Sequence, residues 1–525
     1  MTERLSISLR HSAGLGLFFS LSALGCNSVT NLDSYQVGPD TTKDPAPSCD
    51  TNAACTETAT EKAGGEETPS VCVKSTGRCE KLLSEDCDAI TGDYLDDRAI
   101  IIGSMFSTKG AQAATNIQRQ QSAMLAVNQI NNVTGIPGAD GNPRKLVLVS
   151  CDESTDLRRA GRHLVDDLDV PAIVGPNTSQ DTLDLSSDIT IPGGTVVMSP
   201  TAVASSVASL IDQDLTWLMA PTDVQRAPLM ISQINALETQ LKAERAVEVI
   251  KLGIVYRDDA LGIGTRTSLN DLKLNGKRIS DSVNLGTNVR ISPYDFSAPN
   301  QNDIIEDYVE FLPDIIVLAG TAEAITAVMN PLEDAWPAGK ARPQYVLIDS
   351  AKVTDLIMAA TTHDELRTRV RGTGVTPSPI SAPVYDAFKV DYQIAYPGSA
   401  IVSGMGASYD ATFAIAFALA ATKDQPVSGA AVAEGLRKLA DGPTAIQIGA
   451  TRVLQAFQKL AAGEKITATG TFSTLAWSAD GAVAGGALEM WCIGAPGGKP
   501  AFQSSGLTFD IMTQTESGAY TPCGP

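Results

Sequence analysis

The segment best suited to bind a charged ligand joins an apolar run to a polar one. The run Ala172–Val174 predicts a buried strand, and Gly175-Pro176 ends it before the polar residues Asn177, Thr178 and Ser179. These three residues are typical helix caps, so a helix N-terminus is expected here. Free backbone N–H groups and the positive end of a helix dipole would suit a carboxylate or another anion. The same residues also fit a capped turn that binds nothing, so the surrounding chain has to decide.

Polar residues also end or follow several other apolar runs that predict strands. The runs lie at 99–103, 146–149, 195–198, 252–256, 315–318 and 345–348. Continuous apolar strands indicate a parallel sheet with both faces covered, and such sheets bind ligands beyond the carboxyl ends of their strands. The polar residues at these ends are Ser104, Asp152, Asn177, Thr178, Ser179, Ser199, Thr201, Tyr256, Thr321 and Asp349. Two such edges facing each other would line a cleft for a small zwitterionic or polyhydroxylated ligand.

Amphipathic helical patterns separate these strands. Ala123, Val127 and Ile130 recur at helical spacing after the first strand, and a similar pattern at 157–168 follows the second. The alternation of strand and helix breaks near Pro221 and resumes after a long helical stretch that begins at 228. The sequence therefore predicts an α/β protein of two similar lobes, each built on a parallel sheet.

Composition narrows the classes of function. The chain has 525 residues, of which 43% are hydrophobic, enough for two or more domains. Its formal charge of −21 and pI near 4.6 argue against binding to nucleic acid or to an anionic membrane surface. No GxSxG, GxxxxGK[ST] or HExxH motif is present. We therefore expect a non-enzymatic protein without a cofactor or a metal site.

The N-terminus has the pattern of an export signal. Two arginines precede an apolar run at 13–24, which is too short to span a bilayer and ends in Gly25-Cys26. The residues before Cys26 resemble the lipobox of bacterial lipoproteins, although Ala23 stands where Leu is expected and Leu24 where a small residue is expected. The resemblance implies a signal peptide at 1–25 and lipidation of Cys26, which would hold the protein on a membrane. Ordinary secretion is the alternative.

The remaining cysteines are even in number, as expected for disulfides in an exported protein. Several fall in a polar stretch at 26–97, which predicts a tether that carries a small disulfide-stapled module. We predict bridges of Cys87 with Cys151 and of Cys492 with Cys523, and two more among Cys49, Cys55, Cys72 and Cys79. A zinc site is the alternative for this cluster, but CxxC pairs and nearby histidines are missing.

From about Ala99 to about Gly481 the chain resembles the branched-chain amino-acid-binding family of periplasmic solute-binding proteins, which have the type I fold. The matching segments are AVNQIN at 126–131, VSCD at 149–152, IVGP at 173–176 with Ser179, VMSPTA at 197–202, VYRD at 255–258 with Gly262 and Gly264, SYDA at 408–411 and WSADG at 477–481. The resemblance implies two Rossmann-like lobes joined by three crossovers and closing on a ligand. It places 98–221 and 370–443 in lobe one, and 222–369 and 444–525 in lobe two.

The resemblance also implies how a ligand is held. The residue matching Ser179 and the segment matching 199–203 hold the α-carboxylate and α-ammonium of an amino acid in the family. Val203 stands where the family has Thr, and Leu261 where it usually has Tyr, so the side-chain pocket is not the usual one. The predicted ligand-binding residues are Thr178, Ser179, Ser199 and Thr201 in lobe one, with Tyr256, Thr321 and Asp349 in lobe two. An acid such as Asp349 would suit the ligand's ammonium.

These expectations describe a lipid-anchored protein, facing the periplasm or the outer surface, that captures a small amino-acid-like ligand for an ABC-type permease. A ligand-sensing receptor with the same two lobes is the alternative, because the chemistry of capture would be identical. A purely structural surface lipoprotein is a third possibility, and it would need no polar cleft.

Overall fold

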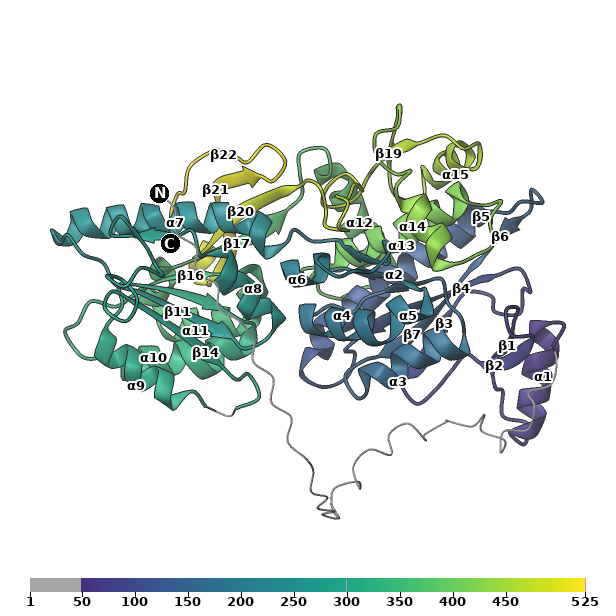
Figure 1. Cartoon of the computed structure of the whole chain (residues 1–525), viewed down its shortest axis with the longest axis horizontal. Helices are drawn as coiled ribbons and strands as arrows, with labels where there is room; N and C mark the ends of the chain where they lie inside the picture. The colour runs from purple at the N-terminus through teal and green to yellow at the C-terminus, as the bar shows by residue number, and fades with distance from the viewer. Residues whose placement is uncertain (1–48, 299, 525) are drawn as a thin grey trace, which may run out of the picture. The chain divides into compact units, whose positions relative to one another are not determined.

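The structure, a computed structural model, describes residues 49–298 and 300–524 (Figure 1). The predicted signal peptide at 1–25 and the predicted lipidation site, Cys26, lie outside these residues. Within the described part of the chain, no helix is long and apolar enough to cross a membrane.

Lobe one is built on a six-stranded sheet in the order β10-β9-β8-β4-β7-β3. All its strand pairs are parallel except that of β3 with β7 at one edge. The strands are β3 (Cys87–Thr91), β4 (Ile100–Phe106), β7 (Leu146–Asp152), β8 (Ala172–Val174), β9 (Val196–Ser199) and β10 (Thr216–Leu218). The helices are α2 (Ala113–Val133), α3 (Leu157–Arg162), α4 (Ser179–Leu185), α5 (Ile191–Gly193), α6 (Ser205–Ala208), α12 (Ala382–Ala395), α13 (Met405–Ala421), α14 (Gly429–Leu436) and α15 (Val453–Ala461).

Both faces of this sheet are covered, as the apolar strands predicted. Ile102 and Leu148 belong to the hydrophobic cluster that includes α2 and α13, whereas Val149 and Ile173 belong to the cluster that includes α3. Figure 1 shows α13 and α2 above α4 and α5, with α3 lowest. Because the buried strands end at one edge, the polar residues that follow them are brought together there.

Lobe two is built on an eight-stranded sheet in the order β14-β11-β15-β16-β17-β20-β21-β22. The pairs from β14 to β17 are parallel, and the last three strands pair antiparallel. The strands are β11 (Leu252–Arg257), β14 (Val289–Tyr294), β15 (Ile315–Ala319), β16 (Gln344–Leu347), β17 (Val370–Thr376), β20 (Ala487–Gly494), β21 (Ala501–Asp510) and β22 (Thr515–Ser517). The helices are α7 (Asp223–Arg245), α8 (Ala260–Ser268), α9 (Asn302–Phe311), α10 (Asn330–Ala335) and α11 (Thr354–Thr362).

The chain passes between the lobes three times, as the family resemblance implied. The crossovers lie at 219–222, 377–381 and 470–486. They are tied to one another and to the adjoining elements by backbone groups: Leu218 N donates to Gly481 O at 2.9 Å, and Ser378 N donates to Phe472 O at 3.0 Å. The Gln225 side chain, at the start of α7, donates to Val483 O at 2.8 Å.

The division of the chain between the lobes differs from the predicted one in two places. Strand β17 was expected in lobe one, but it pairs with β16 and β20 in the lobe-two sheet. The segment 444–475 was expected in lobe two, but β18 (Thr444–Gln447), α15 and β19 (Ile466–Thr469) contribute Ile446, Phe457 and Ile466 to the lobe-one core. Periodicity could not place these elements, because both lobes are built from the same strand and helix patterns.

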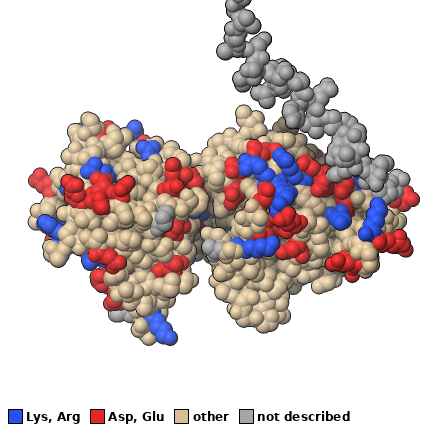
Figure 2. All heavy atoms as spheres, turned by 90° about the horizontal axis from the view of Figure 1, so that it is seen from below, with Lys and Arg blue, Asp and Glu red and all other residues tan. Residues whose placement is uncertain are grey.

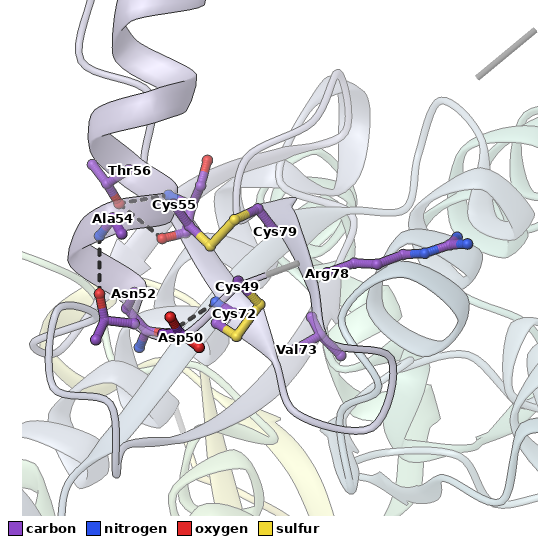
Figure 3. Close-up of a disulfide and its surroundings, with 12 residues drawn as sticks. Cys49, Asp50, Asn52, Ala54, Cys55, Thr56, Cys72, Val73, Arg78 and Cys79 are labelled. Carbon is purple, nitrogen blue, oxygen red and sulfur yellow. Dashed lines mark hydrogen bonds between the residues drawn. A yellow bond between two sulfur atoms is a disulfide. The ribbon is translucent and has the colours of Figure 1, made fainter. Parts of the chain in front are cut away.

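The cysteine-rich module at 49–82 consists of α1 (Asn52–Lys62) and the hairpin of β1 (Ser70–Val73) and β2 (Arg78–Lys81). The bridge Cys49–Cys72 reaches β1, and Cys55–Cys79 joins α1 to β2 (Figure 3). The sulfurs of Cys49, Cys55 and Cys79 lie within 4.8 Å of one another. Each is bonded to another sulfur in a disulfide, so none is free as the thiolate that zinc requires.

The module is not a free tether. Val71, Val73 and Leu82 are buried in a cluster that includes residues of lobe one. Strand β3, also within the predicted tether, is an edge strand of the lobe-one sheet, and Cys87–Cys151 joins it to β7. Cys492–Cys523 joins β20 to the C-terminal segment. All the predicted disulfide pairings are therefore confirmed, whereas the predicted domain boundary at 97 is not a break in the structure.

Acidic and basic side chains are intermixed on the face shown in Figure 2. Ion pairs also link the arginines of α3 to acids, since Arg158 pairs with Asp188 at 2.5 Å and Arg159 pairs with Asp86 at 2.6 Å. This face therefore offers no continuous basic stripe for a nucleic acid backbone.

Candidate functional site

Thr178 caps helix α4. Its Oγ1 accepts a hydrogen bond from Asp181 N at 3.0 Å and donates to Asp181 Oδ2 at 2.5 Å. The helix N-terminus that the sequence predicted as an anion site is thus capped by the side chain of Thr178. Its first turn also carries the carboxylate of Asp181. Burial raises the pKa of Asp181, although the hydrogen bond from Thr178 opposes this.

Ser179 and Ser199 are buried and satisfied within lobe one. Ser179 Oγ accepts from the backbone N–H groups of Val203 at 3.0 Å and Ala204 at 3.1 Å. Ser199 Oγ donates to Pro176 O at 2.5 Å and accepts from Ala202 N at 3.2 Å. The two serines therefore fix the loop that follows β9, and their hydroxyls are already engaged.

Thr201 begins a polar network that leads to helix α2. Its Oγ1 donates to Asn177 O at 2.8 Å, and Asn177 Nδ2 donates to Asn116 Oδ1 at 2.6 Å. Arg119 Nη1 donates to the same Asn116 oxygen at 2.9 Å, and Arg119 Nε donates to Ser403 O at 2.9 Å. This network holds a guanidinium beside Thr201. Desolvation lowers the pKa of Arg119 to about 10, an effect that the charges of Asp349 and Glu153 oppose.

Two acids lie at the end of strand β7, Asp152 as its last residue and Glu153 directly after it. Asp152 Oδ1 accepts from Thr108 N at 2.8 Å and Ser154 Oγ at 2.9 Å, so this carboxylate shapes the loop after β4. Glu153 is 6% exposed, and its Oε1 accepts from Ser107 Oγ at 3.2 Å. Its Oε2 is buried with no hydrogen-bond donor among the described residues. Burial raises the pKa of Glu153 to about 8, helped by the charge of Asp181.

Thr321 lies in a charged cluster at the edge of lobe two. Its N–H and its hydroxyl both donate to the Glu323 carboxylate, and Arg257 Nη1 lies 3.4 Å from Thr321 Oγ1. Arg257 also pairs with Asp259 at 2.7 Å, and Tyr294 OH donates to Glu323 at 2.9 Å. Burial raises the pKa of Glu323, but the bonds from Thr321 and the charge of Arg257 outweigh it and lower the pKa. The hydroxyl of Thr321 is therefore engaged within lobe two, whereas Arg257 Nε is buried without a hydrogen-bond partner among the described residues.

Asp349, the predicted partner of the ligand's ammonium, is paired with Arg226. Arg226 Nη1 lies 2.5 Å from Asp349 Oδ2, and Arg226 Nε donates to Pro221 O at 2.8 Å. Both side chains line a small cavity to which lobe one contributes Val203. Asp223 also lines this cavity and accepts a hydrogen bond from Ser205 N at 3.2 Å. A carboxylate of lobe two is therefore already hydrogen-bonded to a backbone N–H group of lobe one.

Tyr256 is half-buried and packs against an apolar cluster rather than standing free at the edge. The two departures from the family pattern, Val203 and Leu261, belong to this same cluster. The cluster also holds Met230 and Ile348, which line the cavity beside Asp349. The wall of the interlobe cavity is therefore more apolar than the family resemblance implied.

The structure adds polar and charged residues that the sequence reasoning missed. Glu153 directly follows Asp152, so the strand-end rule could have identified it. Arg119 and Asn116 lie on α2, and Arg226 lies on α7. A polar residue on a helix is usually solvated, and nothing in the sequence marked these three as turned toward the strand ends.

Comparison with known proteins identifies the architecture. No family model matches the sequence, and no curated protein matches it. Among solved structures, LivJ of Streptococcus pneumoniae in complex with isoleucine matches 77% of this chain and 99% of its own, with 18% identity and a TM-score of 0.54. The leucine-binding protein LivK of Thermotoga maritima matches 77% of this chain and 98% of its own, with 14% identity and a TM-score of 0.56.

A type 1 periplasmic binding protein of Bordetella pertussis matches 77% of this chain and all of its own, with 16% identity and a TM-score of 0.55. The chain has the type I periplasmic-binding fold. This fold brings the carboxyl-end edges of two sheets to a common region, where the charged residues described above gather. The chemistry of those residues determines which ligand fits.

Proposed function

We propose that this protein is a non-enzymatic, extracytoplasmic solute-binding protein that captures a small amino-acid-like ligand between its two lobes. The supporting observation is that both sheets of a type I periplasmic-binding fold end in polar, charged edges, with Thr201 and Arg119 in lobe one and Arg226 and Asp349 in lobe two. LivJ, which shares this fold, was solved with isoleucine bound.

The captured ligand would be passed to an ABC-type permease. The structural neighbours include an ABC transporter substrate-binding protein from Desulfitobacterium hafniense in complex with leucine. Lipidation of Cys26 would keep this protein at the membrane, facing the periplasm or the outer surface. These two steps rest on the lipobox-like sequence and on the transport role of the neighbours.

A ligand-sensing receptor is the second candidate function, and the cysteine-rich module favours it. The module at 49–82 packs on lobe one and is stapled by two disulfides. Capture of a ligand for transport does not need such a module, whereas a receptor could present it to a partner protein.

A thermal-shift screen of the purified full chain tests ligand capture. The compounds are α-amino acids, ω-amino acids, diamines, dicarboxylates and sugars. A ligand present at 100 times its dissociation constant should stabilise the protein by about 2.7 kcal/mol, which is readily detected as a rise in melting temperature. A rise with one chemical class supports capture. An unchanged melting temperature with every class would reject capture of a small molecule. The remaining candidate function would then be a receptor that binds a protein partner.

A further inference from the structure

The groups expected to hold an amino acid's charged ends are bonded to the chain itself. Ser179 Oγ already accepts from Val203 N and Ala204 N, the backbone groups of the segment that the family uses for the ligand. Asp349 is paired with Arg226. A zwitterionic ligand at these groups would have to displace hydrogen bonds and an ion pair that are largely buried, at a substantial cost.

Glu153 is the first charged group near this edge for which no ion pair is found among the described residues. It is 6% exposed, Ser107 donates to its Oε1, and its Oε2 is buried without a donor among the described residues. A buried carboxylate oxygen without a donor is costly, and natural proteins seldom keep one unless a ligand, an ion or a proton satisfies it.

Arg119 is the second charged group near this edge for which no ion pair is found among the described residues. Its guanidinium donates only to neutral oxygens among the described residues, those of Ser403 and Asn116, and no described carboxylate forms an ion pair with it. It is half-buried and is held in place on both sides, by the network of Asn116, Asn177 and Thr201 and by the close approach of Gly404. A fixed guanidinium without a counter-ion is suited to a carboxylate.

These two groups act on the same region. Glu153 follows β7, and Arg119 is linked through Asn116 to Asn177, which follows β8, with β4 alone between those two strands of the lobe-one sheet. The charge of Arg119 also interacts with those of Glu153 and Asp349. We propose that Arg119 binds the carboxylate and Glu153 binds the ammonium of a zwitterionic ligand, so that this pair, rather than Ser179 and Asp349, recognises the captured molecule. This proposal rests on the proposed function and specifies the residues and the ligand class.

The assignment makes a distinct chemical prediction. A molecule with both a carboxylate and an ammonium satisfies Arg119 and Glu153 together, whereas a dicarboxylate repels Glu153 and a diamine repels Arg119. Sugars would leave both charges unpaired. Charge complementarity should therefore dominate selection, since the apolar cluster of Val203, Leu261 and Met230 contributes no polar discrimination.

The test is a titration of the full chain with L-leucine, 5-aminopentanoate, 1,5-diaminopentane and glutarate, followed by the same titration of Arg119→Gln and Glu153→Gln. We expect binding of one or both zwitterions and none of the diamine or the dicarboxylate. Each substitution should weaken zwitterion binding at least about tenfold, as expected for loss of a charge-assisted hydrogen bond in a desolvated site. Binding of pentanoate, which lacks the ammonium, should respond to Arg119→Gln but not to Glu153→Gln.

Matched controls are Arg162→Gln on α3 and Glu57→Gln on α1, both exposed, which should leave the dissociation constant unchanged. A melting temperature for each variant separates misfolding from lost recognition. Unchanged zwitterion binding in folded Arg119→Gln and Glu153→Gln would overturn this site while leaving capture intact. Binding of glutarate, of the diamine or of a sugar in place of the zwitterions would also overturn it, and would still support a solute-binding protein.

Discussion

Arg226 Nη1 lies 2.5 Å from Asp349 Oδ2, and the two side chains are 7% and 19% exposed. Because the arginine neutralises this acid, Asp349 is not free to receive a ligand's ammonium. Asp349→Asn would leave a buried guanidinium without its partner, which should lower the free energy of unfolding by about 3 kcal/mol.

The affinity for a zwitterion should be nearly unchanged in folded Asp349→Asn. Chemical denaturation and titration calorimetry of the same sample measure both quantities. Asp303→Asn, on the exposed start of α9, is the control and should change neither. A large loss of affinity with little loss of stability would restore Asp349 as a ligand residue.

Gly404 allows the backbone to approach Arg119. It has a φ of +83°, and a Cβ there would lie 2.5 Å from Thr201 Cγ2 and 2.9 Å from Arg119 Nε. Gly404→Ala should therefore displace the guanidinium and weaken zwitterion binding, in addition to costing about 1 kcal/mol of stability for the left-handed backbone.

Gly398→Ala is a matched control, because Gly398 has a φ of +82° and nothing within 4 Å of an added Cβ. It should cost a similar backbone strain and leave ligand affinity intact. Equal affinities for the two variants in calorimetric titration would show that the position of Arg119 does not matter for binding.

Zwitterion binding should depend on pH through Glu153. The groups that face it are Asp152 at the end of β7, Asp181 on α4, Arg119 on α2 and Ser107 after β4. With a pKa of about 8, Glu153 is mostly protonated at pH 6, so an ammonium must displace a proton. The dissociation constant should fall by about tenfold or more between pH 6 and pH 8, and Glu153→Gln should remove this dependence. A flat profile for the unmodified protein would contradict the role of Glu153.

The same raised pKa has a consequence for stability. An unfolded glutamate loses its proton near 4.5, whereas Glu153 in the folded chain keeps it to about 8. Folding therefore becomes less favourable as pH rises between these two values. Glu153→Gln should flatten this part of the stability profile, measured by denaturation at several pH values, and leave stability near pH 4 unaffected.

Glu333 is the centre of a buried charge network in lobe two. It is fully buried and lies 2.6 Å from both Arg342 and Arg369, and Tyr345 OH donates to it at 2.8 Å. Burial raises its pKa, but the hydrogen bond and charge of Arg369, with smaller contributions from Tyr345 and Arg342, outweigh it and hold the pKa below its usual value. Its stabilising contribution is therefore present above about pH 4.5 and is lost as the pH falls through the lowered pKa.

Glu333→Gln should cost about 3 to 5 kcal/mol at neutral pH, because two guanidinium groups lose their partner. Asp188→Asn breaks the exposed pair with Arg158 and should cost less than about 1 kcal/mol. Denaturant titration at pH 7 compares them. Similar costs for the two substitutions would mean that the buried network contributes no more than a surface pair.

Much of the fold could be predicted because its determinants are local. The strand at Ala172–Val174 lies where the apolar run was, and the strand beginning at Leu252 ends within one residue of its predicted limit. The crossovers and the place of β17 could not be predicted, because pairing with β20 depends on residues more than a hundred positions away. Burial of Val71 and Leu82 depends likewise on lobe one, so the module looked like a tether.

The positions of the candidate residues could be predicted from the sequence, but their contacts could not. Thr178, Ser179, Ser199 and Thr201 do gather at one edge, as the strand ends indicated. Whether a hydroxyl is free depends on distant partners, and Ser179 is engaged by backbone groups 24 and 25 residues later. The unpaired charge of Arg119 depends on α2 meeting the loop at Ser403, a contact 284 residues apart in the chain.

A crystal structure of the full chain with its strongest stabilising compound tests the central claim most directly. We predict a zwitterion between the lobes, with its carboxylate at hydrogen-bond distance from Arg119 and its ammonium at hydrogen-bond distance from Glu153. A compound bound to Ser179 and to Asp349, with Arg226 displaced from Asp349, would contradict the account. A compound bound outside the region between the lobes would also contradict it.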